Sequence, residues 1–124
     1  MRYYDELVRF EDREGFEIIV DKTWEDIALR DCFDDTCYDI ADMERKVNDG
    51  SLDWFMLRVR ALVDGHELAA EYLGGCLYED ARECLTDGTA EDLIETAVIN
   101  AKKAVWPLMR KLQAINEEIE RETV

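Results

Sequence analysis

The residues of this chain best suited to thiol chemistry or metal binding are four cysteines, Cys32, Cys37, Cys76 and Cys84, and the single histidine, His66. Four thiolates can hold a zinc ion, but the spacing here matches no compact zinc-binding motif. Cysteine–histidine catalysis would need one thiol beside His66 and a third group to orient the imidazole. Nothing in the spacing indicates that arrangement. We therefore expect reduced structural thiols, with a zinc site assembled in three dimensions as the alternative.

Carboxylates are far more abundant than any other chemically active group. The chain has 31 Asp and Glu against 15 Lys and Arg, a formal net charge of −16 in 124 residues. Because they are so numerous, carboxylates do not single out a catalytic pair. The sequence also has no serine nucleophile elbow, Walker loop or dinucleotide-binding fingerprint. The acids near residue 35 lack the alternating ligands and central glycine of an EF-hand. We expect a protein without catalytic residues, bound metal or cofactor.

The negative charge is unevenly distributed along the chain. Residues 1–88 contain 24 acids and 10 bases, whereas residues 89–124 contain 7 acids and 5 bases. Within the first part, residues 21–53 contain 11 acids and 4 bases, so this segment is the most acidic. Charge of this size repels nucleic acid, which proteins bind mainly through Lys and Arg. We therefore expect no direct binding of nucleic acid.

Two interpretations of the acidic segment remain open. In the first, the acids form a solvated helix face that only keeps the protein soluble. In the second, carboxylates imitate the phosphates of nucleic acid and occupy the basic groove of a host nucleic-acid-binding enzyme or defence complex. The second predicts a non-enzymatic inhibitor of the anti-restriction or anti-CRISPR type, encoded by a phage or mobile element. The residues predicted to bind such a partner are Asp31, Asp34, Asp35, Asp39, Asp42, Glu44, Asp49 and Asp53.

The clearest local structure is a β-hairpin over about residues 54–73. Residues 54–63 are strand-like, and Asp64-Gly65 favours a type I′ turn. A two-residue turn places Val63 opposite His66. Counting back from that pair predicts Leu57 opposite Tyr72, and Arg58 opposite Glu71 as an ion pair across the strands. Gly74-Gly75 is expected to end the second strand or form a bulge in it.

The residues before the hairpin predict three helices and one strand. Tyr3, Leu7 and Phe10 have the spacing of an amphipathic helix over residues 2–12. Residues 16–20 are rich in β-branched side chains and predict a strand. A helix is expected to begin at Trp24, with Trp24, Ile27 and Ala28 facing inward. A further helix is expected over about residues 34–48, where apolar side chains recur every three or four residues.

The C-terminal part predicts one long helix that begins near Thr89. Its apolar stripe includes Ile94 and continues toward the C-terminus, although Pro107 is expected to kink or break the helix near residues 105–106. Either the helix folds back, or its far end packs on another chain. An alternative function follows, an adaptor or assembly protein that dimerises or binds a partner through this helix. The contact residues would be Leu108, Leu112, Ile115 and Ile119.

Together these elements predict a single acidic α+β domain over residues 1–124. A small antiparallel sheet centred on the hairpin packs against helices, and a long C-terminal helix closes the core. No run of about 18 apolar residues is present, so we expect no membrane span. The first residues lack the apolar stretch of a signal peptide, and anionic lipid repels an acidic surface. We therefore expect a cytoplasmic protein, located in the host cytoplasm if a phage encodes it.

Overall fold

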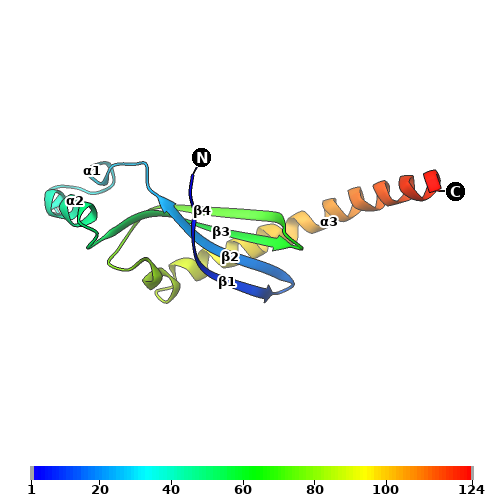
Figure 1. Cartoon of the computed structure of the whole chain (residues 1–124), viewed down its shortest axis with the longest axis horizontal. Helices are drawn as coiled ribbons and strands as arrows, with labels where there is room; N and C mark the ends of the chain where they lie inside the picture. The colour runs from blue at the N-terminus through cyan, green and yellow to red at the C-terminus, as the bar shows by residue number, and fades with distance from the viewer. Residues whose placement is uncertain (1, 124) are drawn as a thin grey trace.

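A computed structural model describes residues 2–123 and contains one four-stranded antiparallel sheet and one long helix (Figure 1). This architecture confirms the predicted α+β class. In chain order the elements are β1 (Asp5–Arg13), β2 (Phe16–Trp24), α1 (Leu29–Cys32), α2 (Ile40–Asn48), β3 (Asp53–Val63), β4 (His66–Tyr78), the 3-10 helix η1 (Ala81–Leu85) and α3 (Thr89–Thr123). The strands lie in the order in which they occur in the chain, as a meander.

Two tight turns close the hairpins β1–β2 and β3–β4. Glu14 and Gly15 have φ angles of 55° and 94°, and Asp64 and Gly65 have φ angles of 48° and 78°. Two successive positive φ values define the type I′ turn, whose twist matches that of the paired strands. The predicted turn at Asp64-Gly65 is thus confirmed. Both turns lie at the same end of the sheet, because β2 and β3 are joined at the other end.

The predicted hairpin register is correct at the turn and wrong beyond it. Val63 pairs with His66, but an irregularity between Ala61 and Leu62 shifts the remaining pairs by one residue. Leu57 consequently lies opposite Leu73, and Arg58 lies opposite Tyr72. A bulge adds one residue to one strand only, so a register counted from the turn cannot include it. The second irregularity falls at Gly74-Gly75, where a bulge was one of the two expectations.

The predicted helix over residues 2–12 is wrong, because this segment forms the edge strand β1. Tyr3 and Phe10, two members of the supposed helical stripe, are exposed. The same segment pairs its backbone along β2 after the Glu14-Gly15 turn. Hydrogen bonds with the neighbouring strand of the hairpin therefore override a weak helical periodicity.

The helices predicted after β2 are shorter than expected. β2 continues through Trp24, and the side chains of Trp24, Ile27 and Ala28 are exposed rather than inward-facing. The helix predicted over 34–48 begins only at Ile40. Asp34 accepts a hydrogen bond from the Thr36 amide, and such a turn competes with helix formation.

The long helix α3 begins at Thr89 as predicted and covers one face of the sheet (Figure 1). Its side chains Ile94, Ala97, Val98 and Ala101 are buried against the sheet. The sheet contributes a matching row of apolar side chains: Phe16, Ile18, Val20, Phe55, Leu57, Val59 and Ala61. This single layer of contacts between helix and sheet is the hydrophobic core.

Beyond the sheet, α3 continues as a projection. The helix is unbroken at Pro107 and does not fold back, so the predicted break is absent. Proline removes one backbone hydrogen bond. The carbonyl released by Pro107 is that of Lys103, an exposed residue, so it can bond to water. Within residues 2–123, no helix is both long and apolar enough to cross a membrane.

Candidate binding surfaces

The connection between β2 and β3, residues 25–52, forms a separate projection that we call the acidic lobe. It lies at the end of the molecule opposite to the C-terminus (Figure 1). Adjacent antiparallel strands need a connection of only about two to five residues. The acidic lobe carries nine acids and three bases, yet its only buried side chains are those of Leu29 and Ile40. The sheet–helix core is therefore complete without most of this segment.

Several of the predicted partner-binding acids form local ion pairs. Asp42 contacts both Arg45 and Lys46 on α2, and Glu44 lies 2.5 Å from Arg30. A hydrogen bond with Lys46 is the main cause of the lowered pKa of Asp42. Outside the lobe, Asp53 contacts Lys22 across the sheet. The pairs within the lobe each have one exposed partner and contribute little to stability, whereas Lys22 and Asp53 are both partly buried.

Other predicted acids accept backbone hydrogen bonds. Asp39 caps α2 by accepting from the amide of Asp42, at 3.1 Å. Asp34 and Asp49 each accept from an amide two residues further along, both at 2.9 Å. These contacts lower the pKa of Asp34, through the Thr36 amide first, and that of Asp49, through the Ser51 side chain first. Both carboxylates therefore stay ionised at neutral pH.

Four of the predicted acids surround one open hollow of about 1070 Å³ in the acidic lobe. The acids are Asp31, Asp34, Asp35 and Asp39. The aromatic rings of Phe33 and Tyr38 lie at the same hollow, with their centroids 5.1 Å apart. Asp53 lies elsewhere, at a second hollow shared with β1 and the segment after β4. The structure thus groups half of the predicted set and separates Asp53 from it.

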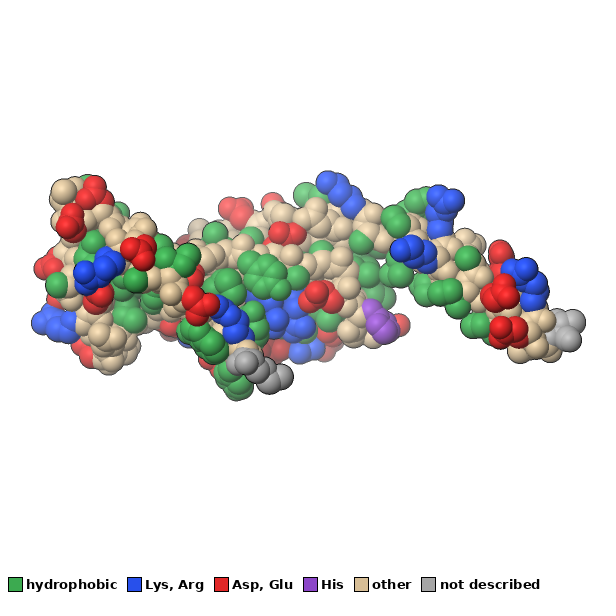
Figure 2. Space-filling model, turned by 90° about the horizontal axis from the view of Figure 1, so that it is seen from above, with side chains coloured by type: hydrophobic (Ala, Val, Ile, Leu, Met, Phe, Trp, Pro, Cys, Tyr) green, Lys and Arg blue, Asp and Glu red, His purple; other side chains and the backbone are tan. Residues whose placement is uncertain are grey.

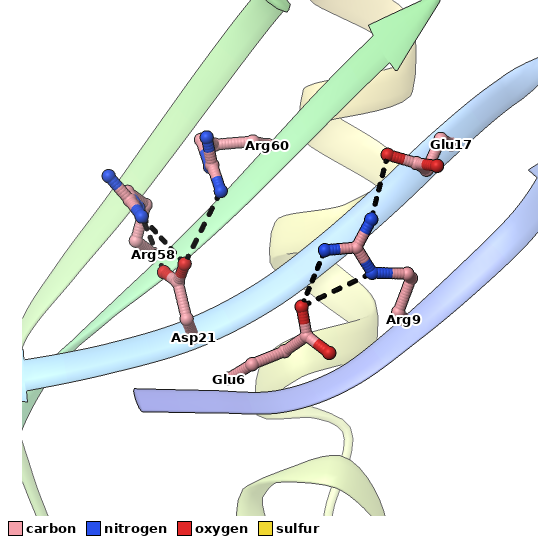
Figure 3. Close-up of polar contacts among 6 residues, drawn as sticks. All are labelled: Glu6, Arg9, Glu17, Asp21, Arg58 and Arg60. Atoms are coloured by element: carbon pink, nitrogen blue, oxygen red, sulfur yellow. Dashed lines mark hydrogen bonds and ion pairs between the residues drawn. The ribbon is translucent and has the colours of Figure 1, made fainter. Parts of the chain in front are cut away.

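A polar network on the sheet face opposite α3 was not predicted (Figure 3). Asp21 is only 3% exposed and accepts two hydrogen bonds from Arg58, at 2.8 and 2.6 Å. Arg60 approaches the same carboxylate at 3.7 Å. Asp21 and Arg58 are cross-strand neighbours on β2 and β3, so only the register of β2 against β3 could have predicted this pair.

A second part of the network joins β1 to β2. Arg9 donates to Glu6 at 2.8 Å and to Glu17 at 3.2 Å (Figure 3). The guanidinium of Arg58 also lies 3.5 Å from the ring centroid of Tyr4, a cation–π contact. Three arginines of this acidic protein therefore lie on one sheet face, each beside a carboxylate. The arrangement joins β1, β2 and β3 to one another and balances the charge of these three arginines.

The cysteines fall into two pairs with different surroundings. Cys32 and Cys37 are exposed in the acidic lobe, whereas Cys76 and Cys84 are buried in the core. His66 is exposed beside its turn. Among residues 2–123, no group of three or more His, Cys, Asp or Glu side chains could hold a metal ion.

We expect iodoacetamide to modify Cys32 and Cys37 in the folded protein at pH 8, and Cys76 and Cys84 only after unfolding. Burial excludes the reagent and raises the pKa of both core thiols to about 11, so they stay protonated. Mass spectrometry of native and urea-unfolded samples would count the labels. Rapid modification of all four thiols in the native protein would contradict this arrangement.

Because the two core thiols are buried, we expect the free energy of unfolding to decrease at alkaline pH. In the unfolded chain the two thiols lose their protons near their ordinary pKa of 9.0, and in the folded protein near 11. Their contribution is therefore complete below pH 9 and decreases as the pH rises toward 11.

Comparisons of this chain with protein-family models, curated proteins and solved structures gave no significant match.

Proposed function

We propose that this protein is a non-enzymatic inhibitor that uses its acidic lobe to imitate nucleic acid. Its target would be the basic groove of a nucleic-acid-binding enzyme, such as a restriction or CRISPR effector. The observation that carries the proposal is the position of the charge. The acids are concentrated on a long connection that contributes only two buried side chains. Long connections of this kind in compact domains are usually functional or disordered, and this one contains two helices.

The local ion pairs do not remove the electrostatic basis of this proposal. A pair within the lobe leaves the net charge of the lobe unchanged, so its field at a distance persists. Exposed pairs such as Arg30–Glu44 are also weak and can exchange partners when a stronger cation approaches. Asp31 and Asp35 are exposed, and among the described residues they have no ion pair or hydrogen bond through their carboxylates. A basic partner could therefore bind them without first breaking internal contacts.

The test is capture of a partner by the immobilised chain from a lysate of its host, repeated at rising salt and with duplex DNA as the competitor. We expect one nucleic-acid enzyme to be captured, to be released by duplex DNA, and to bind more weakly as salt increases. The triple variant Asp31→Asn/Asp34→Asn/Asp35→Asn should reduce capture by about tenfold or more. Asparagine keeps the side-chain oxygen that accepts from the Thr36 amide, so the fold of the lobe is preserved.

A matched control removes the same charge from the opposite end of the sheet. Glu11→Gln/Asp64→Asn/Glu67→Gln changes three exposed acids near the two hairpin turns. Asparagine tolerates the positive φ of residue 64. We expect this variant to capture the partner nearly as well as the unmodified chain. Equal losses in the two variants, or capture that is insensitive to both salt and DNA, would contradict the proposal.

A further inference from the structure

The far half of α3 carries an apolar stripe on which none of residues 2–123 packs. From Trp106 to Thr123, which we call the projecting segment, every residue is exposed. Six large apolar side chains lie in it, each between 37% and 64% exposed: Trp106, Leu108, Met109, Leu112, Ile115 and Ile119. Figure 2 shows such side chains along the projection. A contiguous exposed apolar surface of this kind is typical of a site that binds another protein.

The stripe has the spacing of a helix that packs against another helix. Leu108, Leu112, Ile115 and Ile119 are separated by four, three and four residues, the heptad spacing of coiled coils. The same steps extend back through Val105 to Ala101, which packs against the sheet. The projecting segment therefore continues, on the same side of α3, the face that the sheet covers in the first half.

We infer that this stripe is covered by the same segment of a second copy of the chain, running antiparallel. The four-three-four spacing reads the same in both directions. An antiparallel pair thus places Leu108 against Ile119 of the second copy, and Leu112 against its Ile115, on both sides of a twofold axis. Each helix tip then reaches Val105 of the other copy, where α3 leaves the sheet.

Charges beside the stripe favour the antiparallel direction. Lys111 and Glu118 both lie at the position just before a stripe residue, on the same edge of the stripe. Antiparallel pairing brings Lys111 of each copy beside Glu118 of the other, which forms two equivalent ion pairs. In this chain Glu118 contacts Arg121 at 2.9 Å, but that pair is exposed and weak. A parallel pair would place Lys111 beside Asn116 and gain no such contact.

The overall charge of the molecule gives a second reason for this direction. Residues 1–88, which contain 24 acids and 10 bases, include the sheet and the acidic lobe. Parallel helices would hold two such bodies side by side, within reach of their mutual repulsion. Antiparallel helices place them at opposite ends, each with its acidic lobe outermost (Figure 1). Leu108, Met109, Leu112, Ile115 and Ile119, which line or flank the stripe, offer on the order of 500 Å² per copy, and about 1,000 Å² for the pair is the size of a weak but specific interface.

The test measures the mass of the full chain by light scattering and sedimentation equilibrium. We expect a dimer of the 14.5 kDa chain, and a monomer with an unchanged circular dichroism spectrum after Ile115→Asp. Lys111→Glu or Glu118→Lys alone should raise the dissociation constant on the order of tenfold, because like charges then face each other. The double variant Lys111→Glu/Glu118→Lys should restore it to about the original value. Arg110→Glu is the matched control. Arg110 precedes Lys111 and lies on the side of the helix away from the stripe, so this change should have little effect on the dissociation constant.

Three results would overturn the inference. A chain that stays monomeric up to about 100 µM would exclude a second copy as the occupant of the stripe. A dimer that persists after Ile115→Asp would use another surface. Failure of the double charge reversal to restore pairing would exclude the antiparallel arrangement. None of these results bears on the acidic lobe, whose test uses other residues.

Discussion

Replacing Ile94 by alanine is expected to lower the free energy of unfolding by about 3 kcal/mol. Ile94 is 2% exposed and lies on the face of α3 that covers the sheet. The substitution removes buried methyl and methylene groups and leaves a cavity. The side chains of the sheet cannot move to fill this cavity, because the hydrogen-bonded strands fix their positions. Urea unfolding followed by circular dichroism would measure the change. A domain of this size has a stability of only about 5–15 kcal/mol, so the loss is a large fraction of the total.

The same helix provides a matched control for this prediction. Ile99 is 54% exposed and lies on the opposite side of α3. Ile99→Ala makes the same chemical change without opening a cavity, and alanine is the better helix former. We expect the free energy of unfolding to stay within about 0.5 kcal/mol of the original value. If both variants lost similar stability, the assignment of the buried face of α3 would be wrong.

The second large effect concerns the polar network on the other face of the sheet. Asp21→Asn should reduce the free energy of unfolding by about 2 kcal/mol. The neutral amide would leave the guanidinium groups of Arg58 and Arg60 on a half-buried surface without their shared negative charge. The expected loss is smaller than for a fully buried pair, because the side chains of Arg58 and Arg60 are 16% and 25% exposed. Chemical unfolding at pH 7 would measure it.

A double-mutant cycle separates the charge pair from other effects of this substitution. Arg58→Gln combined with Asp21→Asn removes both charges and keeps groups that can hydrogen-bond to each other. We expect the double variant to lose less free energy of unfolding than the two single variants lose together, by at least about 1 kcal/mol. Glu6→Gln is the control on the same face, and it should change stability very little because Arg9 keeps its contact with Glu17. Additive losses would show that Asp21 acts through packing alone.

Local sequence signals were reliable where neighbouring residues decide the conformation. The Asp64-Gly65 turn needs two successive positive φ angles, which glycine and aspartate tolerate, and the pairing of Val63 with His66 follows directly. The strand containing residues 16–20 and the start of the long helix at Thr89 were predicted for the same reason. In each case short-range backbone preference and the tertiary fold agree.

Predictions failed where pairing between strands or an irregularity in a strand competes with the apolar spacing of a segment. The segment 2–12 has helical spacing, but it pairs with β2 and becomes a strand. Trp24 was expected to face inward, and it is half exposed because β2 continues to the point where the chain leaves the sheet. The register error at Arg58 arises because the bulge between Ala61 and Leu62 leaves no clear mark in the sequence.

The sequence alone determined the charge of the molecule, its concentration in residues 21–53, the α+β class and the apolar spacing of the C-terminal helix. These properties depend on composition and on neighbours within a few residues. The tertiary structure decided where those properties act. It placed most of the acidic segment on a lobe outside the core, turned Asp21 into a buried partner of Arg58, and left the second half of the apolar stripe beyond the end of the sheet. The physical reason is that sheet length and strand register fix which part of each pattern is covered, and both depend on contacts between distant residues.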